Sequence, residues 1–68
     1  MINSVKSNRK LQGVTQEELA QALKVSRQTI ISIESSRYIP STVLAIKIAM
    51  FFNKTVEEIF ELERIDFD

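Results

Sequence analysis

The sequence predicts an all-α domain made of five short helices. Three observations support this fold class: most helix starts carry a capping residue, apolar residues recur at helical spacing after each start, and the connections are short. A single glycine and a single proline are typical of a folded domain rather than of a linker. We expect helices at residues 4–12, 16–23, 27–35, 42–52 and 56–60.

The chain has 68 residues, of which 44% are hydrophobic, and this length suits one domain near the lower limit for a self-sufficient core. We expect residues 4–60 to form the core of that domain and residues 61–68 to form a C-terminal tail. The absence of cysteine and histidine excludes disulfides and Cys/His zinc sites, and we expect no cofactor and no metal. Small domains without such cross-links often gain stability by association.

No targeting or membrane segment is evident. The N-terminal ten residues are polar and are not followed by the apolar run of a secretory signal. The most apolar stretch, residues 43–52, has about half the length of a membrane span and contains Lys47. We therefore expect a cytoplasmic protein with no membrane partner.

The formal net charge is zero, but the charges are unevenly distributed. Residues 1–37 contain six basic and three acidic residues, a net +3, whereas residues 38–68 contain three basic and six acidic residues, a net −3. Such a division can mark one face for a polyanion and another for solvent, although a difference of this size also arises by chance.

The second and fifth helices begin with the same capping box. The Thr15 hydroxyl can accept the amide of Glu18, whose carboxylate can reach back to the amide of Thr15, and Thr55 and Glu58 repeat the pattern. The third and fourth helices have serine N-cap candidates, Ser26 and Ser41.

The second and third helices form the most informative pair. Leu19, Ala20 and Leu23 give the second helix one apolar stripe, and only two residues separate its end from the next cap. On the third helix, Ile30 and Ile33 share the core face, and Ile31 should be exposed. The outer face is expected to carry Arg27, Gln28, Ile31, Ser32 and Ser35. Two helices joined by a tight turn, the second with a polar outer face, describe a helix-turn-helix.

The fourth helix is apolar on most of its sides. Its expected core stripe comprises Ala45, Ile48, Ala49 and Phe52, and its other faces carry Val43, Leu44, Ile46, Met50 and Phe51. Such a helix is buried on more than one side. We therefore expect a two-fold dimer through the fourth and fifth helices, with an interface that contains Phe51, Val56, Ile59 and Leu62. Alternatively, the tail covers these residues, and part of it pairs as a short strand with residues 1–3.

A spaced pattern of residues spans the second and third helices and continues on either side. It reads Thr15-Gln16-x-x-Leu19-Ala20-x-x-x-x-Val25-Ser26-x-x-x-Ile30-x-x-Ile33-Glu34, with Lys6 and Arg9 before it and Arg37-Tyr38-x-Pro40-Ser41 after it. This pattern resembles the DNA-binding domain of the phage repressor and Cro family (Xre-like regulators). The resemblance implies a five-helix lambda-repressor-like fold. It also implies a transcriptional regulator that binds double-stranded DNA and is nucleoid-associated when bound. Together with the dimer expected from the fourth helix, this predicts a palindromic operator bound by a homodimer, with repression favoured over activation.

The resemblance also implies roles for individual residues, with the third helix entering the major groove N-terminus first. Base contacts are expected from Arg27, Gln28, Ile31 and Ser32, since arginine can bond guanine and glutamine can bond adenine in bidentate fashion. Ile31 could pack on a thymine methyl or simply be a surface residue. Phosphate contacts are expected from Gln16, Thr29, Arg37, Tyr38, Lys6 and Lys10. A partly buried ion pair between Arg9 and Glu34 is expected to brace the fold without touching DNA.

Two positions depart from the family pattern. Lys24 stands where members usually carry glycine, because the backbone there favours a positive φ, which costs lysine about 1 kcal/mol. Asn8 stands where many members have an apolar residue, so the resemblance does not define how the first helix packs.

Other functional classes fit less well. An enzyme is the least favoured, because His, Cys and a glycine-rich phosphate loop are missing and the paired carboxylates lie at helix starts, where capping explains them. A protein-interaction module or an antitoxin could use the same fold, but acids or a large apolar patch would then be expected on the third helix's outer face. With no second domain, we expect no small-molecule ligand.

Overall fold

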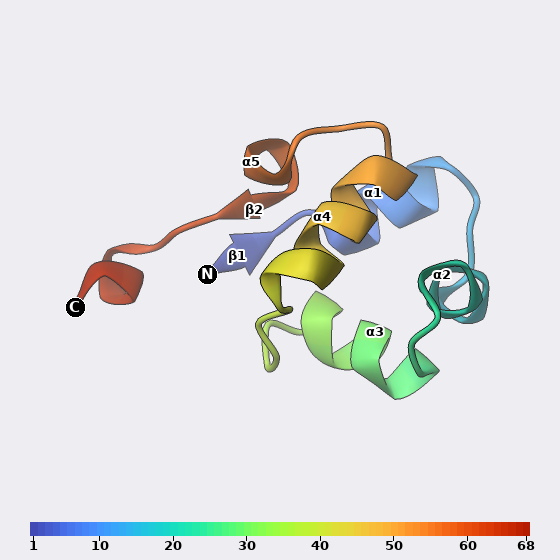
Figure 1. Ribbon diagram of the computed structural model, residues 1–68, viewed down its shortest axis with the longest axis horizontal. Coiled ribbons are helices and arrows are strands. Elements are labelled where there is room, and N and C mark those ends of the chain that lie inside the picture. Colours follow the sequence, from blue (N-terminus) through green and yellow to red (C-terminus); the bar gives the residue numbers. More distant parts are fainter.

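The computed structural model describes residues 1–68 and confirms the predicted fold class, an all-α domain with a short terminal sheet (Figure 1). The helices are α1 (Val5–Leu11), α2 (Gln16–Leu23), α3 (Arg27–Glu34), α4 (Thr42–Phe51) and α5 (Val56–Ile59). The strands are β1 (Ile2–Asn3) and β2 (Phe60–Glu61), and a 3-10 turn, η1, covers Arg64–Phe67. No helix has the length and the apolar character needed to cross a membrane.

The expected caps define the helix starts. Thr15 and Thr55 each form the complete capping box, in which the hydroxyl accepts from the backbone N–H of Glu18 (3.0 Å) or Glu58 (3.2 Å). Ser26 and Ser41 accept from the third residue of α3 and of α4. Each such cap stabilises its helix by about 1 kcal/mol, so the starts are fixed locally.

Helix α1 begins in a different way. Its N-cap residue, Ser4, makes no side-chain cap bond, and the side chain of Asn3 accepts from the backbone N–H of Val5 at 3.1 Å instead. The Asn3 amide also donates to the carbonyl of Ile33 near the end of α3 (3.0 Å). Asn3 thus fixes the start of α1 and links it to α3.

One apolar core unites the five helices. Its fully buried side chains are Val5, Leu19, Ile30, Ile33 and Ile48. The expected core stripe of α4 needs one correction, because Leu44 is buried and Ala45 is only partly buried. Leu44 lies one turn before Ile48 on the same face of the helix, and leucine fills more of the core at this position than alanine would.

Asn8, the polar departure on α1, is buried with its hydrogen bonds satisfied. It is 7% exposed, and its side-chain amide donates to the carbonyl (2.8 Å) and to the hydroxyl (2.9 Å) of Ser4, one turn earlier. A buried amide that keeps its partners avoids the desolvation cost of an unpaired polar group. Asn8 therefore fits within the helical interior.

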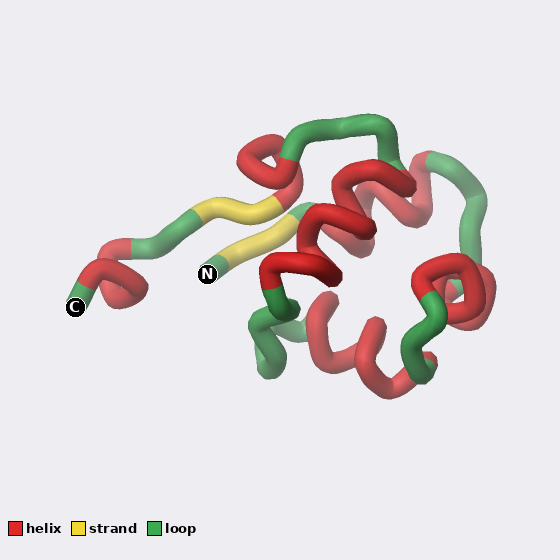
Figure 2. The backbone as a smooth tube through the Cα atoms, in the orientation of Figure 1, coloured by secondary structure: helices red, strands yellow, loops and turns green.

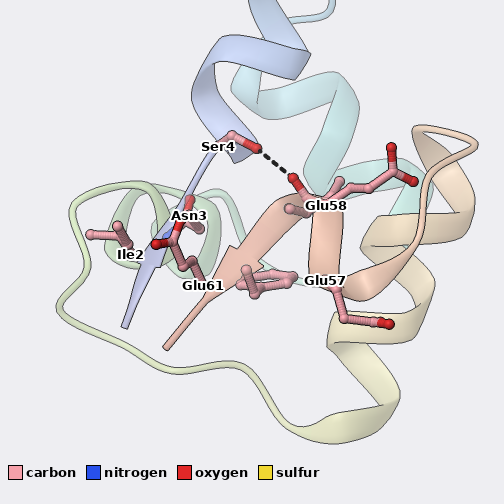
Figure 3. A pocket seen from close by; sticks show the side chains of 8 residues that line it. Ile2, Asn3, Ser4, Glu57, Glu58 and Glu61 are labelled. Carbon is pink, nitrogen blue, oxygen red and sulfur yellow. Dashed lines mark hydrogen bonds between the residues drawn. The ribbon is translucent and has the colours of Figure 1, made fainter. Parts of the chain in front are cut away.

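The chain ends meet in the predicted strand pairing. Strands β1 and β2 are antiparallel, with Ile2 opposite Glu61 and Asn3 opposite Phe60. Figure 2 shows the two strands side by side at one edge of the helical body, and the chain beyond β2 leads away from it. Figure 3 shows the adjacent corner, where the Ser4 hydroxyl donates to the backbone carbonyl of Glu58 at 3.5 Å.

Candidate nucleic-acid interface

The turn between α2 and α3 has the backbone conformation expected at Lys24. This residue is left-handed, with φ 59° and ψ 44°, and its N–H bonds the carbonyls of Ala20 and Gln21 at the end of α2. The next residue, Val25, donates from its N–H to the carbonyl of Ala20 at 3.0 Å. The turn therefore closes α2 tightly although lysine replaces glycine.

A contact that sequence reasoning missed supports the same turn. The ammonium of Lys47, on α4, donates to the carbonyl of Leu23 at 2.7 Å. A cation at a helix C-terminus also interacts favourably with the helix dipole. Lys47, the single charged residue of α4, thereby fixes the position of the α2–α3 turn on the core.

The two faces of α3 differ as the sequence predicts, with one correction. Ile30 and Ile33 are fully buried, while Arg27 and Gln28 are exposed. Ile31, expected to be exposed, is partly buried. At 100° per residue it lies beside the outermost position, Gln28, rather than directly opposite the core face.

Four of the expected contact residues surround one shallow hollow on α3. They are Gln28, Thr29, Ser32 and Tyr38. The Gln28 amide lies 3.4 Å from the Ser32 hydroxyl, at the long end of hydrogen bonding. A weak contact of this kind leaves the amide free to reorient toward a ligand.

The loop after α3 folds back toward this hollow. The backbone N–H groups of Arg37 and Tyr38 both donate to the carbonyl of Ser32, at 2.9 and 3.2 Å. Ser36 adopts a positive φ of 62°, which reverses the chain there. These contacts bring Tyr38, which is 46% exposed, beside the outer face of α3.

Arg9 and Glu34 lie in direct contact across α1 and α3. The guanidinium donates from Nε to Glu34 Oε2 at 2.7 Å and from Nη2 to Oε1 at 3.2 Å, and the two side chains are only 10% and 4% exposed. Arg9 also donates to the carbonyl of Val14 at 2.9 Å. Glu34 Oε1 further accepts from the side chain of Gln16 at 3.1 Å. One carboxylate therefore joins the first three helices.

Besides its hydrogen bond to Glu34, Gln16 also lines a polar hollow on the surface. A polar hollow at the starts of α2 and α3 is lined by Arg9, Thr15, Gln16, Glu17 and Arg27. The side chain of Gln16 is already held by Glu34 in the free protein, and the exposed carboxylate of Glu17 shares the rim with Arg27. Of the remaining expected phosphate contacts, Lys6 and Lys10 are exposed on α1 and line neither hollow.

The residues expected at a dimer interface differ in accessibility. Ile59 is 2% exposed, which corrects its assignment, because the short helix α5 uses this side chain to anchor itself to the core. Phe51 and Val56 are partly buried, and the ring of Phe51 packs edge-on against Phe52 at 5.1 Å. Leu62 is 56% exposed.

Known proteins resemble this chain over nearly its whole length. A family model described as helix-turn-helix matches residues 5–59, which contain all five helices. A relative from Methanocaldococcus jannaschii, named an uncharacterized HTH-type transcriptional regulator, is 54% identical over 93% of this chain and 96% of its own length. Proteins with the same description from Bacillus subtilis and Methanothermobacter thermautotrophicus are 43% and 47% identical, over 93% and 87% of this chain and 96% and 87% of their own lengths.

Proposed function

The chain belongs to the helix-turn-helix family of DNA-binding transcriptional regulators, and we propose that it is a repressor that binds a palindromic operator as a homodimer, with α3 in the major groove. In this proposal the buried face of α3 sets its position, and the outer face reads the DNA.

The observation that carries the proposal is the charge left on the outer face of α3. This helix contains two charged residues, Arg27 and Glu34. Glu34 is almost fully buried and neutralised by Arg9, whereas Arg27 is exposed. A polyanion that approaches α3 therefore meets a cation and neutral hydrogen-bonding side chains but no accessible acid of that helix.

The proposed base contacts follow from the order of residues along α3. Arg27 and Gln28 lie at its N-terminal end, which leads into the groove in this family of motifs. Arg27 would donate two hydrogen bonds to guanine O6 and N7, and Gln28 would pair with adenine, each discriminating by about 1–3 kcal/mol. Ser32, one turn further along, would reach a base edge, and Ile31, at the flank, would pack on a thymine methyl.

The proposed phosphate contacts surround this reading face. Thr29 and Tyr38 line the hollow on α3, and the N–H of Arg37 bonds the Ser32 carbonyl beside it. These positions support the proposal that the three residues hold the DNA backbone next to the bases being read. Gln16 would bind a phosphate at the start of α2, and Lys6 and Lys10 would add charge from α1. Each neutralised phosphate steepens the dependence of log K on log salt by about 0.9.

A homodimer resolves how a chain without net charge can bind DNA. Each copy places a basic N-terminal half toward the duplex and an acidic C-terminal half away from it, so the local face governs the encounter. Two recognition helices on one side of the duplex would sit about 34 Å apart, one helical turn of DNA.

Selection of bound duplexes from a random pool tests the proposal. The parent protein should enrich a palindrome, and Arg27→Ala or Gln28→Ala should each relax the preference at one symmetric pair of positions. Gln21→Ala, which changes an exposed glutamine of α2, is the matched control and should leave the palindrome unchanged. Failure of the parent protein to enrich any sequence would contradict the proposal.

A further inference from the structure

The C-terminal tail presents apolar side chains that no part of the chain covers. After β2 the backbone leaves the helical body and ends in η1 (Figures 1 and 2). Leu62, Ile65 and Phe67 are 56%, 73% and 76% exposed. Three large apolar residues within a six-residue segment are more than the scattered exposure that is normal for a surface.

The tail nevertheless has a defined conformation. The N-terminal ammonium of Met1 lies 2.8 Å from a carboxylate oxygen of Glu63 and 2.8 Å from one of Asp66. The backbone N–H of Glu63 donates to Asp66 at 2.7 Å, which closes the first turn of η1. These contacts hold the tail beside β1, with its apolar side chains directed into solvent.

An apolar hollow lies on the same end of the molecule, between the start of α4, α5 and β2. It has a volume of about 180 Å³, and six of its eight lining residues are hydrophobic, among them Ile39, Ile46, Val56 and Phe60. An apolar cavity of about 150 Å³ in a protein accepts a benzene molecule, so the hollow has room for one aromatic ring. Beside it, Val43, Ile46 and Met50 form an exposed stripe one and two turns apart along α4.

We propose that the tail of one copy docks into this hollow of a second copy, and that the exchange is reciprocal. Phe67 inserts its ring, while Leu62 and Ile65 cover the exposed stripe of α4. Because each copy supplies both a tail and a hollow, the contact is isologous and closes as a two-fold dimer. The inference rests on the homodimer of the proposed function and identifies the surface that forms it.

The area available matches what a stable dimer needs. At the stated exposures, the three tail side chains carry about 400 Å² of accessible surface per copy. If each buries an equal area of the partner, two reciprocal contacts remove about 1,600 Å², the size of a standard specific interface. A single tail docked once would remove only half of that.

The charges of the tail exclude DNA as its partner. Residues 61–68 contain four acids and one basic residue, Arg64. A segment of this composition is repelled by a polyanion, and its docking on a second copy would keep it on the acidic half of the dimer. A second copy also supplies a complementary hollow without any further component.

Sedimentation of substituted full-length chains tests the exchange. The Ile65→Ser/Phe67→Ser variant should raise the dimer dissociation constant by at least about a hundredfold, because each dimer loses four buried apolar side chains. Leu11→Ser, which changes an 84% exposed leucine of α1, is the matched control and should sediment like the parent. A tail variant with an unchanged dissociation constant would overturn the proposal, as would a parent chain that stays monomeric at about 100 μM, well above the nanomolar to micromolar range of specific complexes.

Cysteine cross-linking tests which surface the tail touches, and the cysteine-free chain suits it. An untagged Asp68→Cys chain keeps the docking ring of Phe67, and Thr42 lies at the lining of the hollow. Mixed with an affinity-tagged Thr42→Cys chain, it should form a tagged–untagged disulfide about tenfold more than with tagged Gln21→Cys, since docking raises the local thiol concentration. Equal cross-linking to both would overturn the exchange. Arg27→Ala should relax the DNA preference at one symmetric pair of positions and leave the dimer dissociation constant unchanged, so the tail exchange and the reading face are tested independently.

Discussion

Removal of the Glu34 carboxylate should strongly destabilise the fold. In Glu34→Ala, the Arg9 guanidinium keeps its bond to the Val14 carbonyl but loses both bonds to a carboxylate, and Gln16 loses its acceptor. Breaking one partner of a buried ion pair costs about 3–5 kcal/mol. Because the Arg9 side chain retains 10% exposure, we take the lower value, about 3 kcal/mol.

That loss is a large part of the total stability. A domain of 68 residues has a free energy of unfolding of about 3–10 kcal/mol. For domains of this size 1 kcal/mol changes the melting temperature by about 4–8 °C, so Glu34→Ala should melt about 12–24 °C lower. Circular dichroism at one fixed protein concentration measures the shift, since the melting temperature of a protein that associates depends on its concentration.

Two further variants identify the cause. Glu17→Ala removes an exposed acid from the neighbouring helix and should change the free energy of unfolding by less than about 0.5 kcal/mol. Arg9→Met with Glu34→Leu replaces both charges by apolar groups and should recover most of the loss, because no unpaired charge then stays buried. If Glu34→Ala melts within about 2 °C of the parent, the brace does not stabilise the fold.

Three further predictions concern helix ends and turns. The capping boxes lower the pKa of Glu18 and of Glu58, chiefly through the backbone N–H bonds of Thr15 and Thr55. The stabilisation by these two carboxylates is therefore complete above pH 4.5, the unperturbed value, and is lost as the pH falls through the lowered pKa values. The urea midpoint of the parent should fall over this pH range, and the midpoint of the Glu18→Gln/Glu58→Gln variant should fall less steeply. Lys24→Gly should relieve the left-handed strain and raise the free energy of unfolding by up to about 1 kcal/mol; a lower urea midpoint would contradict this. Lys47→Met should lower the free energy of unfolding by about 1 kcal/mol through loss of the bond to the Leu23 carbonyl, whereas Lys54→Met should not.

Helix positions could be predicted because their determinants are local. A threonine followed three residues later by a glutamate contains both halves of a capping box, and the structure has that box at both expected positions. The left-handed conformation of Lys24 follows from the family resemblance, because members usually carry glycine at this position, and the structure has it with φ 59°. These features needed no knowledge of the tertiary fold.

The contacts that the sequence did not reveal join residues far apart in the chain. Lys47 and the Leu23 carbonyl are 24 residues apart, and Gln16 and Glu34 are 18 apart. Lys47 and Gln16 are polar side chains on helix surfaces, where solvent exposure is the ordinary expectation. Only the docking of α4 on α2, and of α2 on α3, brings a partner within reach.

The burial of Ile59 illustrates the opposite error. An apolar residue beside other unpartnered apolar residues was assigned to an interface, yet a helix of four residues has little else with which to attach itself to the core. The hydrophobicity of a residue predicts that its side chain is buried, but it does not show whether the chain's own core or a partner buries it. The exposed fractions of Leu62, Ile65 and Phe67 are therefore stronger evidence for a partner than their hydrophobicity alone.

The two glutamines expected to contact DNA, Gln16 and Gln28, differ in how firmly their side chains are held in the free protein. Gln16 is committed in the free protein, at 3.1 Å from a carboxylate that also holds Arg9, so its side chain can reach a phosphate only by leaving that bond. Gln28 gives up only a 3.4 Å contact with Ser32, which costs little. If both contact DNA, Gln16 would therefore act mainly through its backbone and orient α2, while the side chain of Gln28 is free to select a base. The buried ion pair of Glu34 with Arg9 thus fixes the orientation of α3, and this orientation determines where the exposed side chains of Arg27 and Gln28 point.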